Sequence, residues 1–279
     1  MTCGGLSSNS PLAGTDWDGS ARAYDRFEKK WHYYFRVAEG LVRPLGIERD
    51  SRVLELACGT GACTLALSRR CPSGEVVCVE RSAPMMDMAR KNARSARREN
   101  VSFVQGDVSR LPELLACEAR FDFAVCNSAF WQFPKSVQVG EAVRKSLKPG
   151  GVFAFNLPSL FSLTKERRLY RDAVDEVLGK HGIDRRRFWR RRKREDYHAS
   201  VERAGFTVVK DTHYYVVVQA REMMEWRSIP IFARRWGNFA GLPAGVSAEI
   251  SSTIRKRRLL WPDDRGRRSR WRMIMSIGE

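Results

Sequence analysis

The chain has 279 residues, of which 43% are hydrophobic, and a net charge of +18. That length predicts one or two domains with a substantial buried core. No stretch approaches eighteen uninterrupted apolar residues, so no transmembrane helix is predicted.

Residues 1–19 are rich in Gly, Ser and Thr and lack the basic and apolar regions of a signal peptide, so we expect a flexible tail. The seven cysteines include no C-x-x-C pair. We expect them to be small buried residues in a reducing cytoplasm, rather than disulfides or metal ligands. The protein is therefore expected to be cytoplasmic and to hold no metal.

The positive charge lies mainly in the C-terminal third. Residues 181–279 hold 23 Lys and Arg against 11 Asp and Glu, which is +12 of the total of +18. Residues 185–194 alone hold eight basic residues, with Phe188 and Trp189 among them. Such a block is either a solvated surface or a contact with an acidic partner such as nucleic acid.

Residues 20–48 carry aromatic and apolar side chains at three- and four-residue spacing. This spacing predicts an amphipathic helix or helix pair, which Pro44 and Gly46 end. Two compatible interpretations remain open: a helical segment packed on the edge of a sheet, or a helical lid over a ligand pocket.

A short apolar strand at Val53–Leu56 is followed by a turn that carries Gly59 and Gly61, and then by a helical run. Glycines let the backbone turn sharply and let a ligand approach it, and the helix start presents free N–H groups. We interpret the segment as a ligand-binding turn. A dinucleotide is a poor match, because Ala57 stands at the first glycine position of that family and because Gly61 is followed three residues later by Thr64, not by a small residue.

The second strand, residues 74–80, ends in Glu80, which lies 19 residues beyond Gly61. An acid at this position can accept hydrogen bonds from a ribose diol, although a surface glutamate at a strand end is the simpler alternative. Ser82 is expected to cap the next helix. Met85 or Met86 could lie against an adenine ring or pack in the core.

The third strand, residues 101–105, is followed by Gly106-Asp107-Val108. The Asp107 carboxylate could accept adenine amino hydrogens, or it could cap the next segment as an Asx turn. The fourth strand, residues 121–126, is followed by Asn127 on the side where ligands lie in such sheets. Residues 148–151 are expected to form a turn before a fifth strand at 152–157.

In order and spacing, these motifs resemble those of class I S-adenosylmethionine-dependent methyltransferases over about residues 20–220. The motifs that carry the resemblance are residues 55–61, Glu80, Gly106-Asp107, residues 121–127 and Leu147-Lys148-Pro149-Gly150-Gly151, and Ala57 departs from the family's glycine. The resemblance implies an α/β fold: a seven-stranded Rossmann-like methyltransferase sheet with helices on both faces, carrying helical cap insertions. The cofactor-binding core is then residues 49–158.

Outside that core we expect a helical basic insertion at residues 159–198 and a C-terminal part of the core at residues 199–279. The latter would contain a helical insertion at 221–268 and a final antiparallel strand at 269–277. The alternative places the seventh strand at Tyr214–Gln219 and leaves the tail as an appendage.

The resemblance also implies the site. S-adenosylmethionine would be held by Tyr24, Glu55, Ala57, Gly59, Gly61, Glu80, Arg81, Met85, Gly106, Asp107, Val108 and Asn127. The acceptor pocket would be walled by Trp31, Trp131, Phe161, Trp226 and Phe232. His32 is the candidate catalytic base, although an ordinary, partly buried histidine is the simpler alternative, with catalysis by positioning alone.

These features predict a methyltransferase that acts on a small organic or lipid-like acceptor in biosynthetic metabolism, under an aromatic lid. Asn127-Ser128-Ala129-Phe130 stands where an Asn-Pro-Pro-Tyr motif would mark amino methylation of adenine or glutamine. Two alternatives stay open. One is methylation of an acidic macromolecule, either RNA or a carrier-protein-bound acyl group; the other is a non-catalytic protein that binds the cofactor or nucleic acid.

Overall fold

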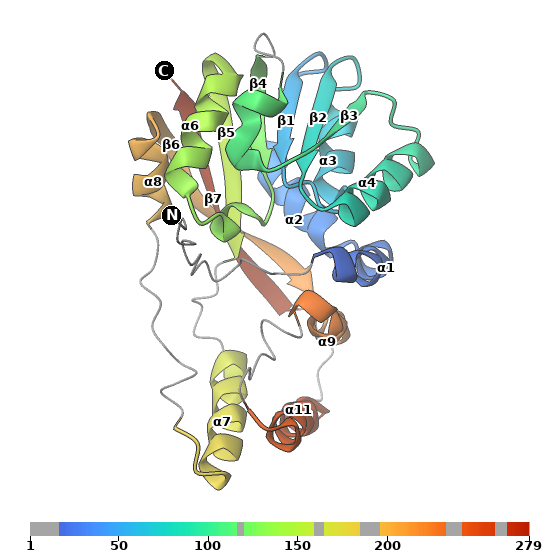
Figure 1. The fold of residues 1–279 in the computed structure, drawn as a ribbon, viewed down its shortest axis with the longest axis vertical. Helices are drawn as coiled ribbons and strands as arrows, with labels where there is room; N and C mark the ends of the chain where they lie inside the picture. Colours follow the sequence, from blue (N-terminus) through green and yellow to red (C-terminus); the bar gives the residue numbers. More distant parts are fainter. Residues whose placement is uncertain are drawn as a thin grey trace, which may run out of the picture.

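A computed structural model describes residues 17–115, 120–158, 165–184, 196–232, 242–259 and 267–278. Its centre is a seven-stranded sheet in the order β3-β2-β1-β4-β5-β7-β6 (Figure 1). The strands are β1 (Arg52–Leu56), β2 (Glu75–Glu80), β3 (Val101–Gln105), β4 (Phe121–Cys126), β5 (Leu147–Pro158), β6 (Phe206–Val218) and β7 (Arg267–Gly278). The predicted seven-stranded α/β fold is confirmed.

The last strand lies inside the sheet. Strands β1 to β5 pair in parallel, whereas β7 is antiparallel to both β5 and β6. The alternative that placed the seventh strand at Tyr214–Gln219 is wrong, because β6 continues through Val218. A register shift between Val208 and Lys210 lets β6 continue along the whole length of β7.

Helices cover both faces of the sheet, as the apolar character of both strand faces requires. They are η1 (Asp18–Ser20), α1 (Ala21–Trp31), α2 (Tyr33–Val42), η2 (Arg43–Leu45), α3 (Ala62–Arg70), α4 (Ala83–Ser95), η3 (Val108–Arg110), α5 (Leu111–Leu114), η4 (Phe130–Gln132), α6 (Ser136–Ser146), α7 (Lys165–Lys180), α8 (Tyr197–Arg203), α9 (Ala220–Ser228) and α11 (Ala244–Leu259). One core packs α2 and α3 on the sheet, and the other packs α6 and α8 on the opposite face.

The aromatic N-terminal segment forms two helices, because the chain bends at His32. This residue adopts φ +50°, in the left-handed region, between α1 and α2. The carboxylate of Glu28 reaches past the bend and accepts the N–H groups of Tyr34 (2.9 Å) and Phe35 (2.8 Å). A side chain of α1 therefore caps the start of α2.

The predicted turn at residues 148–151 is a bulge within β5, so that prediction was wrong in detail. Phe121 pairs with Leu147 and Phe123 pairs with Val152, so two steps along β4 match five along β5. Gly150 adopts φ +73°, which a glycine tolerates without strain. The extra residues are accommodated while the strand keeps its pairing on both sides.

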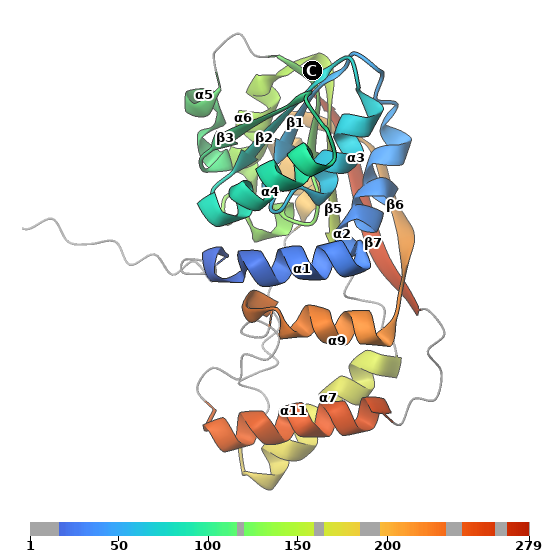
Figure 2. The same ribbon diagram turned by 90° about the vertical axis from the view of Figure 1, so that its right-hand side faces the viewer.

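The cap elements lie beyond the carboxyl ends of the parallel strands (Figure 2). Helix α9 lies beside α1, while α7 and α11 pack on each other through Val174, Val177, Leu178, Val246 and Ile250. The basic run 185–194, most of the predicted tail and the predicted pocket residue Phe161 lie outside the described residues. Among the helices that are described, none has the length and apolar character needed to cross a membrane.

Candidate cofactor and acceptor site

The turn after β1 is built from three residues with positive φ. Ala57 has φ +53°, Gly59 has +56° and Gly61 has +90°. A Cβ at Gly59 would meet nothing within 4 Å, whereas one at Gly61 would lie 3.2 Å from the Cα of Ala89 on α4. Gly59 therefore leaves open space beside the turn, and Gly61 lets α4 pack closely against it.

Glu55 lies beneath this turn and is only 1% exposed. Its Oε2 accepts the Thr64 hydroxyl at 2.6 Å and the Cys78 thiol at 3.3 Å, which joins β1 to α3 and β2. Burial raises the pKa of Glu55 from 4.5 to about 7. The structure places this predicted cofactor residue where it supports the turn.

Glu80 closes the turn from the end of β2. Its Oε2 accepts the Gly59 N–H at 2.9 Å and its Oε1 accepts the Ser82 N–H at 2.8 Å. Burial raises the pKa of this carboxyl, and the two backbone donors partly offset that effect. Each carboxylate oxygen can accept a further hydrogen bond, so Glu80 keeps capacity for a diol.

The end of β3 lies next to Glu80. The Gly106 N–H donates to the Glu80 carbonyl at 3.0 Å. Asp107 Oδ1 accepts the N–H and hydroxyl of Ser109, at 2.9 and 2.8 Å, and Oδ2 lies 3.8 Å from Arg81 Nη1. Asp107 thus makes the expected Asx-type cap and still directs its second oxygen toward Arg81.

Two further residues predicted to bind the cofactor are largely buried. Met85, in the first turn of α4, is 2% exposed, and Val108 packs in the core on the α6 side. Val108 can therefore offer a ligand only its backbone, while Met85 lies near the N-cap residue Ser82, whose hydroxyl accepts the Met85 N–H.

Sequence reasoning missed a set of contacts that tie the N-terminal segment to α4. Asp18 Oδ1 accepts the Ser82 hydroxyl at 2.5 Å. Asn92 Nδ2 donates to Asp25 Oδ1 at 2.7 Å and to the Thr60 carbonyl at 2.9 Å. These contacts place η1 and α1 against the glycine turn. No local sequence pattern predicts the contacts.

A buried polar network lies at the ends of β4 and β5, and it was also missed. Asn156 Nδ2 donates to Asn127 Oδ1 (2.8 Å) and to the Tyr214 hydroxyl (2.7 Å), and its Oδ1 accepts the Ser128 N–H (2.6 Å). Tyr214 in turn donates to the Val37 carbonyl at 2.8 Å. The signal available in the sequence was an asparagine within the apolar run 152–157, and the structure shows that it is fully buried.

An aromatic cluster covers the turn from the cap side. Tyr24 stacks on Tyr34 with ring centroids 5.0 Å apart, and Trp226 stacks on Phe232 at 4.1 Å. Trp226 Nε1 donates to the Tyr34 hydroxyl at 2.8 Å. Ala62, the first residue of α3, belongs to the same cluster, so the aromatic side chains contact the glycine turn.

The predicted pocket residues divide between two places. Trp31 joins the aromatic cluster at its edge and donates to Glu225 Oε2 at 2.9 Å, which ties α1 to α9. Trp131 instead packs against the core on the α6 side and donates to the Ser128 carbonyl at 3.2 Å. His32 has an exposed side chain at the bend between α1 and α2, so its role as a base stays a prediction.

A glycine turn after β1, an acid at the end of β2 and a capped aspartate after β3 converge at the carboxyl edge of the sheet. With the antiparallel β7, this arrangement defines a class I S-adenosylmethionine-dependent methyltransferase. Residues 47–205 match the family model described as a methyltransferase domain, and the chain belongs to that family. Its cofactor is S-adenosylmethionine.

Two curated relatives show the range of acceptors among similar proteins. The chain is 29% identical over 143 residues to malonyl-[acyl-carrier protein] O-methyltransferase of Halalkalibacterium halodurans, which covers 49% of this chain and 51% of that protein. It is 27% identical over 168 residues to demethylmenaquinone methyltransferase of Staphylococcus aureus, covering 57% and 67%. The first match thus spans about half of that relative's length.

Solved structures share the fold at low sequence identity. The [4+2]-cyclase SpnF aligns with a TM-score of 0.60 and 16% identity, over 100% of this chain and 99% of that one. Phosphoethanolamine N-methyltransferase 2 of Haemonchus contortus, in complex with S-adenosyl-L-methionine, aligns with a TM-score of 0.54 and 13% identity, over 100% and 61%. Because a protein named as a cyclase shares it, the fold alone does not determine the reaction.

Proposed function

We propose that this methyltransferase acts on a small, largely apolar or lipid-like organic acceptor that is held under the aromatic cluster. The observation that carries the proposal is the packing of Tyr24, Tyr34, Trp226 and Phe232 in one cluster with Ala62 of the cofactor turn. An acceptor seated among these rings would lie next to the methyl donor. Apolar and aromatic linings with a few polar groups are typical of small-molecule sites.

Separate groups of residues would bind the cofactor and enclose the acceptor. Gly59, Gly61, Glu80, Asp107 and Asn127 would hold the cofactor, whose sulfonium supplies an electrophilic methyl group when it is bound. Helices α1 and α9 belong to the predicted cap regions 20–48 and 221–268 and are joined by the ion pair of Lys30 and Glu225 at 2.7 Å. They would form the lid over the acceptor. They would exclude water and hold the acceptor in line, and orientation of this kind can supply about 7–11 kcal/mol.

Positioning, rather than a strong base, is the catalytic strategy we propose. Burial raises the pKa of both Tyr24 and Tyr34, so these phenols stay protonated. The Tyr34 hydroxyl can then donate a hydrogen bond to an acceptor. The carboxylate of Glu28 is occupied by the start of α2. His32 would need to turn inward to act as a base.

The test is an acceptor screen with isotope-labelled S-adenosylmethionine, using apolar phenols, quinols and fatty acyl compounds. Trp226→Ala and Phe232→Ala should weaken acceptor use at least tenfold while cofactor affinity, measured by calorimetry, stays within twofold; burial of each ring contributes about 1.5–3 kcal/mol. Trp131→Ala is the matched control outside the cluster. Equal losses in all three variants would contradict the proposed acceptor site.

A carrier-protein-bound acyl group is the second candidate acceptor. The net charge of +18 and the relative from Halalkalibacterium halodurans favour it. Turnover of a carrier-bound acyl group that falls steeply with salt, together with no turnover of the free acyl compound, would favour it over the first candidate. We also propose a cytoplasmic location, since the five described cysteines are free and buried, as in a reducing compartment.

A further inference from the structure

Strands β6 and β7 continue as a two-stranded ribbon past the carboxyl edge of the sheet. From its C-terminal end back to Trp271, β7 pairs with β5, whereas its pairing with β6 continues further toward the start of the strand, as far as Arg267. Figures 1 and 2 show the ribbon projecting beside α9, at the end of the molecule where the cap lies. The ribbon therefore lies at the same end as the acceptor site.

The two faces of this ribbon differ in character. Val216, Val218 and Trp271 are buried in the aromatic cluster. Tyr215 and Val217, which alternate with them, are 54% and 55% exposed. Large exposed apolar side chains next to each other mark a contact surface more often than isolated ones do.

Arginines stand directly opposite these apolar residues. Tyr215 pairs with Arg270, and Val217 pairs with Arg268, so each pair shares one face with its side chains in contact range. Neither arginine side chain forms an ion pair or hydrogen bond with a described residue, whereas the Arg272 side chain, next along the same face, is paired with Asp211.

Arg270 carries a further sign of a missing partner. Its Nε is shielded from solvent and has no hydrogen-bond acceptor. A shielded donor without an acceptor is costly, and an anionic group approaching this face would supply one. The face thus combines an exposed Tyr and Val with two arginine side chains that have no counter-ion within the described part of the chain.

We propose that this face, formed by Tyr215, Val217, Arg268 and Arg270 (the ribbon face), docks the enzyme on an anionic lipid bilayer. Tyr and Val can enter the headgroup boundary while the arginines extend to lipid phosphates. Single-stranded nucleic acid would need successive stacking rings, and the ribbon face exposes only Tyr215. The inference rests on the proposed lipid-like acceptor, which would enter the aromatic cluster directly from the bilayer.

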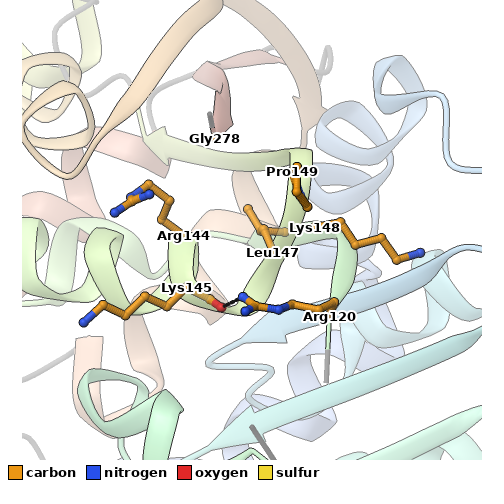
Figure 3. A pocket seen from close by; sticks show the side chains of 7 residues that line it. All are labelled: Arg120, Arg144, Lys145, Leu147, Lys148, Pro149 and Gly278. Atoms are coloured by element: carbon orange, nitrogen blue, oxygen red, sulfur yellow. Dashed lines mark hydrogen bonds between the residues drawn. The ribbon is translucent and has the colours of Figure 1, made fainter. Parts of the chain in front are cut away.

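A second basic region provides a matched control. Arg144 and Lys145 line a cavity at the opposite, amino edge of β4 and β5, with Arg120, Leu147, Lys148, Pro149 and Gly278 (Figure 3). Neither of the two has an ion-pair partner among the described residues. Neutralising them removes the same charge at the far end of the sheet.

The experiment is flotation of the full chain with vesicles of phosphatidylcholine mixed with phosphatidylglycerol, compared with phosphatidylcholine alone. Arg268→Gln/Arg270→Gln should weaken binding to anionic vesicles about 25-fold, since each cation contributes roughly fivefold. Tyr215→Ser/Val217→Ser should weaken it about tenfold or more. Arg144→Gln/Lys145→Gln should change it less than threefold.

Three results would overturn the proposal: equal losses in both charge-neutralised variants, no preference for anionic vesicles, or loss of binding to a single-stranded RNA oligonucleotide without loss of vesicle binding. Cofactor affinity of each variant, measured by calorimetry, confirms that it is folded. Because docking is measured without acceptor or turnover, its failure leaves the proposed methyl transfer intact. Failure of the acceptor screen likewise leaves the docking result intact.

Discussion

The Gly59 N–H donates to Glu80 Oε2 at 2.9 Å, which joins the turn after β1 to the end of β2. The same carboxylate accepts the Ser82 N–H at the start of α4. One side chain therefore sets the distance between the glycine turn and the second strand, the two elements that would hold the methionine and ribose parts of the cofactor.

Glu80→Ala should abolish this arrangement. It leaves two shielded N–H groups without an acceptor, at a cost of about 1–3 kcal/mol each, and it removes the expected ribose acceptor. We expect cofactor affinity to fall at least 100-fold by calorimetry, with a lower melting temperature. Glu113→Ala, which removes an exposed glutamate paired with Arg110, is the control; equal losses in both variants would contradict a role for Glu80.

Ala57→Gly should stabilise the protein. Ala57 holds φ +53°, a conformation that costs an L-residue about 1–2 kcal/mol. Glycine avoids that cost and loses about 0.5–1 kcal/mol through the entropy of the unfolded chain. The expected net gain is about 0.5–1 kcal/mol in urea unfolding, with cofactor affinity unchanged. A destabilised variant would show that the Ala57 methyl group contributes packing that outweighs the strain.

The sheet and the glycine turn could be predicted because their signals are local. Between Val53 and Leu157, the apolar strands, the turn glycines and the acids at strand ends follow one another at the spacing that is typical of class I methyltransferases. The bulge at residues 148–151 could not be predicted, because its glycines are equally compatible with a turn. Its identity depends on how β4 pairs with β5, which is a long-range property.

The site was predicted in part, for the same reason. Gly59, Glu80 and Asp107 lie at or just after the carboxyl ends of β1, β2 and β3, so their meeting at one edge follows from parallel topology. The contacts of Asp18 with Ser82 and of Asn156 with Tyr214 join residues 64 and 58 positions apart. Trp131 was expected in the acceptor pocket; it donates to the Ser128 carbonyl and packs against the core on the α6 side, away from the aromatic cluster.

Glu55→Gln should change how stability depends on pH. The pKa of Glu55 is raised from 4.5 to about 7 by burial, so its contribution to stability is complete below pH 4.5 and is lost as the pH rises through 7. A shift of this size corresponds to roughly 3 kcal/mol. Glutamine stays neutral and still accepts the Thr64 hydroxyl.

We therefore expect Glu55→Gln to match the wild type in urea unfolding at pH 4 and to exceed it by about 2–3 kcal/mol at pH 8. Glu28, whose pKa burial also raises to about 7, keeps part of the pH dependence in the variant. If the variant and the wild type showed parallel curves, Glu55 would not be the group that titrates.

His32→Gly separates a catalytic from a conformational role. Because His32 adopts φ +50° and its side chain is exposed, glycine should stabilise the bend by about 0.5–1 kcal/mol. Turnover should stay within threefold of the wild type across pH 6–9. A loss of roughly 10²–10⁴-fold, with cofactor affinity intact, would instead identify His32 as the general base.

Asn156→Leu should be the most damaging of the substitutions that leave the turn itself untouched. It removes the acceptor of the Ser128 N–H and the donor to both Asn127 and Tyr214, in a fully buried setting. Ser128 holds φ +58°, so its strained backbone depends on that hydrogen bond. We expect a loss of about 2–4 kcal/mol.

Tyr214→Phe supplies the second arm of a double-mutant cycle. It removes the hydrogen bonds to Asn156 and to the Val37 carbonyl while it keeps the ring that packs on Gly40. If the network acts as a unit, the two losses will be less than additive by about 0.5–3 kcal/mol. Cofactor affinity should fall with Asn156→Leu, because Asn127 Oδ1 loses its donor, and should hold with Tyr214→Phe. Additive losses would mean that Asn156 and Tyr214 stabilise the fold independently and that the network does not position Asn127.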